Sequence, residues 1–225
     1  MKALRVFTWL TITLLLLITL TIAGLLYYMT NNLPDVSTLR NVQLQEPLRI
    51  YSADDKLIAE IGNKRRIPVS LAQIPKDLIN AILATEDHRF YQHNGVDIKG
   101  LARAVIGLVT TGEKRQGGST VTMQVARNFF LSRKKTYLRK FNEILLAFKI
   151  EHELTKNEIL SLYLNKIYLG QRAYGVGAAA KIYYGKSVGE LNLAEMAMIA
   201  GLPQAPSAIN PIYNPKAAKN AAAMF

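Results

Sequence analysis

Three patterns of hydrophobic and polar residues follow one another along the chain, and each predicts a different kind of element. The first is an apolar run from Val6 to Met29 that contains no charged residue. A helix of about 24 residues would reach roughly 36 Å, whereas the hydrocarbon core of a bilayer is about 30 Å thick. The run therefore predicts one transmembrane helix over 6–29, preceded by a short tail over 1–5.

The residues around this run predict its orientation. Lys2 and Arg5 precede it, so the positive-inside rule places the short N-terminus in the cytoplasm and the rest of the chain outside it. A cleaved signal peptide and a buried core helix are the alternatives. The run is longer than the apolar core of a signal peptide, which has about 7–15 residues. An uncleaved membrane anchor is the interpretation that we carry forward.

The second pattern is a polar stretch followed by a short alternation. Residues 30–47 are mostly polar and contain Pro34, which predicts a linker. Two β-prone runs, 48–52 and 57–62, flank the turn-like segment Ala53-Asp54-Asp55-Lys56. A short β-hairpin is expected there.

The third pattern, beyond Pro68, has helical spacing. Ile79, Ile82 and Leu83 recur at that spacing after a proline that suits a helix start. Further helices are expected at 98–110, 120–131, 135–153, 155–167, 176–184 and 192–201. The proline-rich tail from Pro203 to Pro215 is expected to be extended. Residues 48–225 therefore predict one mainly α domain.

Composition narrows the class of partner. The chain has 225 residues and a formal net charge of +12, which favours an anionic partner. The predicted anchor argues against nucleic acid and for a membrane surface or a phosphorylated substrate. Because there is no cysteine, disulfides and thiolate metal sites are excluded.

The first polar cluster follows a run of apolar helix. Glu86, Asp87 and His88 stand side by side, with His93 five residues later and Asp97 after it. The spacing is compatible with a network that caps a helix end, with a catalytic carboxylate, or with a metal site. Spacing alone leaves all three open.

The second cluster begins with paired glycines. Gly117 and Gly118 precede Ser119 and Thr120 at a predicted helix start, where free backbone N–H groups and the helix dipole favour an anion. An ordinary N-cap explains the same residues. Ser119, Gln124 and Arg127 carry weight as candidate ligands only when they are taken together.

The third cluster is cationic. On a helix, Glu143 lies three residues after Lys140 and four after Arg139, so the three can share a face. From Arg127 to Lys149 there are seven Lys or Arg residues and one carboxylate. A solvated charged helix is one interpretation, and a cationic wall for a diphosphate is the other.

In this order the clusters resemble glycosyltransferase family 51, the peptidoglycan glycosyltransferase module of class A penicillin-binding proteins and monofunctional transglycosylases. The matching segments are spread over residues 48–215. They are Glu86-Asp-His-Arg-Phe90, His93-Asn-Gly-Val-Asp97, Gly117-Gly-Ser-Thr-Val-Thr-Met-Gln124, Arg139-Lys-Phe-Asn-Glu143, Lys156 to Asn165, Ala173 to Ala180, and Leu193-Ala-Glu195 to Pro206.

The resemblance implies a fold and a reaction. The fold is mainly α, lysozyme-like and two-lobed, with a short N-terminal β-hairpin, and a small lobe that dips into the outer leaflet. The stretch Leu101–Val109 is the candidate for that lipid contact, with a place in the core as the alternative. The reaction polymerises lipid II into glycan strands by an inverting displacement that releases undecaprenyl diphosphate.

The resemblance also implies roles for single residues. Glu86 is the general base that activates the acceptor hydroxyl, and Glu143 is a second essential carboxylate. The residues that contact the donor or its diphosphate are Ser119, Gln124, Arg127, Lys135, Arg139 and Lys140. No cofactor is required; a divalent cation, Mg²⁺ or Mn²⁺, could assist at the diphosphate, but no metal ligand can be assigned.

The remaining implications concern location and integrity. The chain is expected to be a single-pass protein of the bacterial inner membrane, with its domain in the periplasm and the cell-wall synthesis machinery as a partner. Met123 stands where the family usually has glutamine, and Arg127 where lysine is common. The chain ends at Phe225 before an arginine-rich final helix and without a transpeptidase module, so the domain is expected to be incomplete at its C-terminus. A catalytically impaired membrane scaffold and, less favoured, a lysozyme-like glycan-cleaving enzyme are the alternatives.

Overall fold

The computed structural model describes residues 2–111, 118–132, 134 and 136–223. The chain divides into two compact units, Met1–Asp35 and Val36–Phe225, and each is described by itself.

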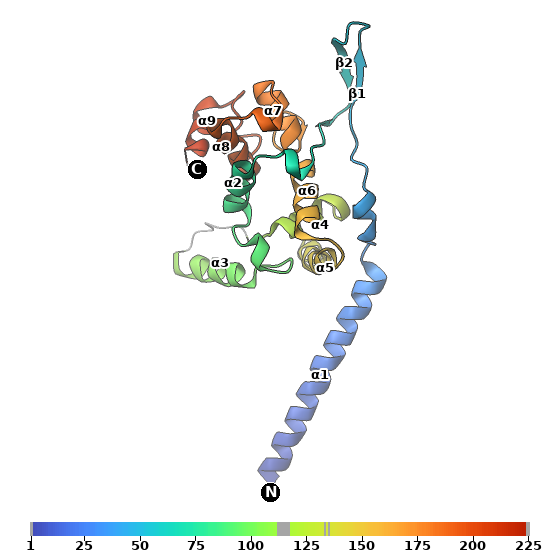
Figure 1. The fold of residues 1–225 in the computed structure, drawn as a ribbon. Helices are drawn as coiled ribbons and strands as arrows, with labels where there is room; N and C mark the ends of the chain where they lie inside the picture. The colour runs from blue at the N-terminus through green and yellow to red at the C-terminus, as the bar shows by residue number, and fades with distance from the viewer. Residues whose placement is uncertain (1, 112–117, 133, 135, 224–225) are drawn as a thin grey trace. The chain divides into compact units, whose positions relative to one another are not determined.

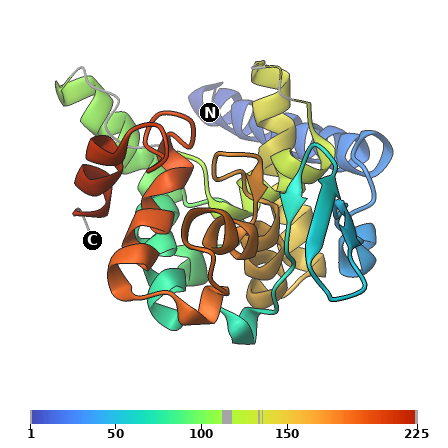
Figure 2. The same ribbon diagram turned by 90° about the horizontal axis from the view of Figure 1, so that it is seen from above.

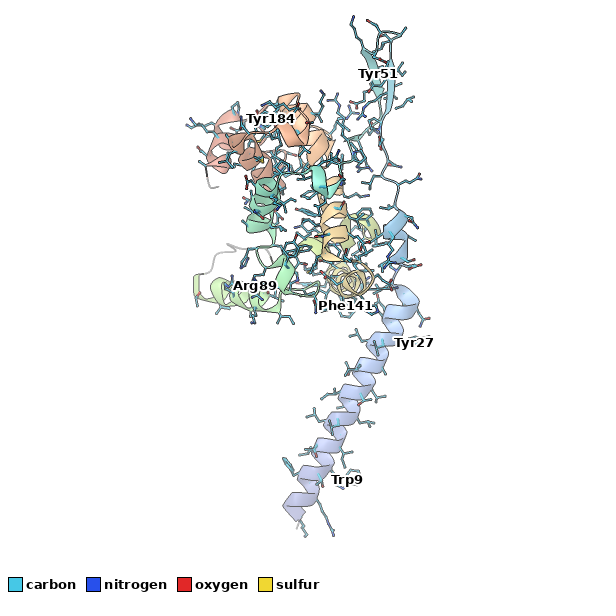
Figure 3. The ribbon with its side chains drawn as sticks, in the orientation of Figure 1. Trp9, Tyr27, Tyr51, Arg89, Phe141 and Tyr184 are labelled. Atoms are coloured by element: carbon cyan, nitrogen blue, oxygen red, sulfur yellow. The ribbon has the colours of Figure 1, made fainter. Side chains whose placement is uncertain are left out.

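The first unit is one long helix, α1 (Lys2–Asn32), with Trp9 and Tyr27 near its two ends (Figures 1 and 3). Over Arg5–Tyr28 it is long and apolar enough to cross a membrane, a test that a signal sequence also passes. Its threonine hydroxyls donate to carbonyls of the preceding turn, for example Thr13 to Trp9 O at 2.8 Å and Thr21 to Leu17 O at 2.7 Å. These polar groups are thus satisfied within the helix itself.

The second unit is mainly helical with two small sheets, which confirms the predicted fold class. Its α-helices are α2 (Lys76–Glu86), α3 (Ile98–Thr111), α4 (Val121–Phe130), α5 (Tyr137–Glu153), α6 (Lys156–Lys166), α7 (Val176–Tyr184), α8 (Leu193–Gly201) and α9 (Pro215–Ala222). Short 3₁₀ helices lie at Ser37–Asn41 (η1), Leu71–Gln73 (η2), Phe90–Gln92 (η3), Val188–Glu190 (η4) and Leu202–Gln204 (η5).

The core forms around two groups of helices. α2 packs on α8, which in turn contacts α9, and α4 packs on both α5 and α6 (Figures 1 and 2). Leu78 and Ile82 of α2 are four residues apart, share one face and are buried. Val121 and Val125 of α4 have the same spacing and are also buried. The helical spacing in the sequence therefore marks the faces that make the core.

Of the two sheets, the sequence predicted one and missed the other. β1 (Leu48–Tyr51) and β2 (Leu57–Ile61) form the predicted antiparallel hairpin, with Leu48 opposite Ile61. β3 (Arg65–Arg66) and β4 (Ala173–Tyr174) form an unpredicted parallel pair.

The prediction of an extended tail from Pro203 to Pro215 is wrong in part. The 3₁₀ helix η5 covers its first residues, and a turn follows in which the buried Asn210 side chain accepts backbone N–H groups of Ile212 and Tyr213. Asparagine favours such turns because its side chain replaces a backbone partner.

Asn165, near the end of α6, joins two distant segments. Its side chain accepts the N–H of Val69 at 2.8 Å and donates to the carbonyls of Val69 at 2.9 Å and Ser161 at 3.0 Å. Since the side chain is buried, water cannot replace these bonds.

Replacing Asn165 with alanine is expected to lower the free energy of unfolding by roughly 2 kcal/mol, because the amide of Val69 loses its partner in the interior. Denaturant unfolding of the full chain in detergent measures this. Asn157→Ala, at an exposed position of the same helix, is the matched control. Equal stability of the two variants would contradict the role assigned to Asn165.

Candidate active site

A cleft of about 540 Å³ opens between the end of α2, the start of α4 and the segment after α8. The cleft is lined by four of the residues to which the resemblance assigns a catalytic or donor-binding role: Glu86, Ser119, Gln124 and Arg127. The structure thus brings together residues up to 41 positions apart, from 86 to 127.

Glu86 is the last residue of α2, and its carboxylate is half-buried. Gln124 Nε2 donates to Glu86 Oε2 at 2.7 Å, and Arg127 lies one turn farther along α4. Burial raises the pKa of the Glu86 carboxyl, while the hydrogen bond from Gln124 and the charge of Arg127 oppose that rise. The carboxylate can therefore accept a proton more readily than an exposed glutamate.

Asp87 fixes the position of Glu86. Its buried carboxylate accepts His93 Nε2 at 2.9 and 3.0 Å and the backbone N–H of Val121 at 2.9 Å. Val121 is the first residue of α4, so the bond ties the end of α2 to the start of the helix that carries Gln124. We call this set of contacts the Asp87 clamp.

A second set of contacts holds the loop that contains His93. Lys156 Nζ donates to His93 O at 2.6 Å and to Glu151 Oε1 at 2.7 Å, and it lies 4.5 Å from the ring centroid of Phe90. Thr120 caps α4 and also donates to Gly95 O at 2.5 Å. The loop that holds His93 is therefore fastened to α4 and to the start of α6.

The cationic cluster forms on α5 and reaches the same cleft. Glu143 is buried and is paired with Arg139 and with Lys140, whose Nζ lies 3.2 Å from Glu143 Oε2. Lys140 Nζ also donates to Ser119 Oγ at 2.6 Å. Because Ser119 lines the cleft, Lys140 brings a positive charge to its edge.

Two sequence-based expectations stand apart from this geometry. Lys135 lies outside the described residues, so its predicted contact with the donor stays a prediction. Among the described residues, no group of three or more His, Cys, Asp or Glu is placed to hold a metal ion. In the first cluster His93 faces Asp87, while Asp97 pairs with Arg89 at 3.5 Å.

Two features of the site escaped the sequence analysis. One is the bond from Asp87 to Val121, because a partner on another helix leaves no local pattern; a capping network in the first cluster was already among the alternatives. The other is Tyr163 of α6, whose buried hydroxyl has no hydrogen-bond partner among the described residues. Burial, followed by the charge of Glu86, raises the pKa of the Tyr163 phenol well above its usual range. The strongly apolar neighbours of Tyr163 in α6 were the only available signal.

A model of the transglycosylase family matches residues 54–225. Penicillin-binding protein 1A of Pseudomonas aeruginosa is 54% identical over 215 residues, which are 96% of this chain and 26% of that protein. The Escherichia coli protein of the same name is 56% identical over 214 residues, 95% of this chain and 25% of that protein. This chain thus spans about a quarter of the length of these curated relatives.

Among solved structures, the crystal structure of penicillin-binding protein 1A from Haemophilus influenzae is similar at 38% sequence identity. The match covers 81% of this chain and 18% of that chain, with a TM-score of 0.45. At that score the likeness of the two shapes adds nothing to the sequence match.

Gln124→Ala is expected to raise the pKa of Glu86 further, because the hydrogen bond that favours the carboxylate is lost while burial remains. A carbon-13 NMR titration of the Glu86 carboxyl in the detergent-solubilised chain measures this. Gln92→Ala, at an exposed glutamine, is the control. A Glu86 pKa that stays unchanged or falls in Gln124→Ala would refute the coupling.

The two glutamates are expected to respond oppositely to replacement by glutamine at pH 7. The raised pKa of Glu86 means that the folded state holds its proton more tightly than the unfolded state, so its ionisation costs stability as pH rises through the folded pKa. Glu86→Gln removes that cost. Glu143→Gln leaves Arg139 and Lys140 without their shared carboxylate and should cost about 3 kcal/mol.

Denaturant unfolding of both variants at pH 7 measures the contrast. We expect Glu86→Gln to be at least as stable as the parent chain and Glu143→Gln to be clearly less stable. The reverse order would show that the environments assigned to the two carboxylates are wrong.

Proposed function

The chain belongs to the transglycosylase family, and on that premise we propose that it is a peptidoglycan glycosyltransferase that polymerises lipid II and releases undecaprenyl diphosphate. The observation that carries this proposal is the pairing, in one cleft, of a carboxylate with a raised pKa and a group of fixed cations. The first suits proton removal from a sugar hydroxyl, and the second suits a departing diphosphate.

Glu86 is the general base in this proposal. The 4-hydroxyl oxygen of the acceptor sugar forms a bond to C1 of the donor as the bond from C1 to the diphosphate oxygen breaks. The hydroxyl proton passes to Glu86, and the electron pair of the broken bond stays on the diphosphate. Attack opposite the leaving group inverts C1. A base of this kind typically contributes about 10²–10⁴-fold to the rate.

Cations and donors stabilise the charge that develops on the diphosphate. Ser119 lies just before α4, Arg127 on α4 and Lys140 on α5, and all three face or border the cleft. Arg139 and Glu143 hold Lys140 in place, and Lys135 is assigned to the same group from the sequence alone. Loss of one such donor costs roughly 3–4 kcal/mol of transition-state stabilisation in other enzymes.

Among the described residues, no set of donors fits a divalent cation. The oxygens of Glu143 are already engaged by Arg139 and Lys140, and Glu86 is held by Gln124. We therefore derive no step through a metal ion and assign the charge compensation to side chains.

The proposal includes a place at the bacterial inner membrane. α1 is assigned as a single-pass anchor with a cytoplasmic N-terminus, because Lys2 and Arg5 flank its start. On α3, Ile98 and Val109 are 70% and 80% exposed, which suits contact with lipid; the side chains of 104–108 lie outside the described ones. An anchored enzyme meets a lipid-linked substrate where that substrate resides, near the growing strand and the cell-wall machinery.

Glu86→Gln is expected to lower the rate of polymerisation at least about 100-fold, because the isosteric amide cannot accept the proton. Purified full-length chain in detergent with labelled lipid II, followed by separation of the products by length, measures this. Asp77→Asn, on an exposed position of the same helix, should leave the rate unchanged.

Other products would support other functions. Release of short muropeptides from preformed glycan, without polymer, would favour a lysozyme-like glycan-cleaving enzyme, in which the cationic group has no evident use. A folded chain that gives neither product would favour a catalytically impaired membrane scaffold.

A further inference from the structure

Beyond the cleft, three cations and two aromatic rings of the second unit come together, with Lys64 exposed, Lys166 half-buried and Arg66 buried. We call Lys64, Arg66, Lys166, Phe129 and Tyr174 the basic aromatic patch. The Nζ of Lys64 lies 5.7 Å and the Cζ of Arg66 lies 5.6 Å from the ring centroid of Tyr174. The Nζ of Lys166 lies 4.2 Å from the ring centroid of Phe129. The parallel pairing of β3 with β4 brings Arg66 next to Tyr174.

The two lysines of the patch differ from Arg66 in their neighbours. Within the described part of the chain, neither Lys64 nor Lys166 has an ion pair, and their close contacts are with the aromatic rings. Arg66 is buried, donates to Gln45 O at 2.7 Å and feels the negative charge of Glu46, while its Nε has no partner among the described residues. A cation close to an aromatic ring keeps its charge and is attracted to the face of the ring. Such cations are ready to meet an anionic group.

The three charges act on one another. Burial, followed by the charges of Arg66 and Lys64, lowers the pKa of Lys166. Mutual repulsion of this kind opposes folding, and an anionic group placed between the cations would relieve it. The arrangement therefore differs from a solvated charged face, in which each lysine is free to turn away from its neighbours.

Two residues of the patch, Phe129 and Lys166, lie on helices close to the cleft, and α4 itself lines it. α4 carries Gln124 and Arg127 as well as Phe129, and α6 carries Tyr163 as well as Lys166. The two helices pack against each other (Figure 1). The charges of Glu86 and Arg127 both act on the pKa of Tyr163. Phe129 and Lys166 therefore lie within one helical turn, along their helices, of Arg127 and Tyr163.

A polymer needs such a surface. A hollow of about 540 Å³ is the size that holds one drug-sized ligand, so a strand of many sugars must leave it and cross the surface beyond. We propose that the basic aromatic patch binds the elongating glycan strand outside the cleft, with Lys64 and Lys166 receiving carboxylates of the strand's peptide substituents. The proposal rests on the proposed function for the identity of the strand.

The test measures binding without turnover. Short uncrosslinked glycan strands that carry their stem peptides are titrated into the full chain with Glu86→Gln, and fluorescence anisotropy of the labelled strand gives the affinity. Adding Lys64→Gln and Lys166→Gln should weaken binding by roughly fivefold per lysine, as expected for partly exposed ion pairs. The difference should vanish with strands whose carboxylates are amidated.

Two controls keep this result specific. Lys76→Gln with Lys216→Gln removes the same net charge at exposed positions elsewhere and should leave the affinity unchanged. Because Lys166 is half-buried, the single variant Lys64→Glu at an exposed position tests the patch again with little demand on the fold.

The outcomes separate the patch from the reaction. Equal strand affinity with and without Lys64 and Lys166 overturns the patch, even if the parent chain makes polymer. Equal losses of strand affinity in the patch variant and in the charge control also overturn it. So does a patch variant that binds phosphatidylglycerol vesicles more weakly but binds the strand as well as its parent. Strand binding could depend on the two lysines while the parent chain, which keeps Glu86, makes no polymer. That result would support the patch and count against the proposed function.

Discussion

The position of the candidate base depends on one buried carboxylate, Asp87. It accepts hydrogen bonds from His93 and from the first N–H of α4, and so it fixes where α2 ends and where α4 begins. Glu86 is the neighbour of Asp87 in the chain, and Gln124 lies one turn into α4. Their hydrogen bond therefore follows from the clamp. A buried carboxylate with three acceptor contacts is costly to displace, so the geometry of the cleft is set by the core beneath it.

The two glutamates of the site show how environment divides one side-chain type into two roles. Glu86 is half-buried, with an amide as its direct partner, and its pKa rises. Glu143 is fully buried and is paired with both Arg139 and Lys140. The first can change its protonation state during a reaction, whereas the second organises positive charge. This difference supports assigning the base to Glu86 and a positioning role to Glu143.

Local patterns in the sequence predicted the helices and the β1–β2 hairpin well, because apolar spacing and turn residues act over a few positions. Contacts between distant segments were beyond that reach. The pairing of Arg66 with Tyr174 and the bond from Asp87 to Val121 join residues that no periodicity relates. For the site, the motifs that resemble a family predicted which residues take part and their order along the chain. That Gln124 meets Glu86, and Lys140 meets Ser119, required the fold.

The threonines of α1 have a consequence for its surroundings. A hydroxyl in hydrocarbon must find an acceptor, and in many helices it finds one on a second helix. In α1 the hydroxyls of Thr13, Thr19 and Thr21 bond to carbonyls of their own helix. Embedded in a bilayer, such a helix would be self-sufficient in its polar groups. It could exchange lipid neighbours and diffuse laterally without recruiting a companion helix.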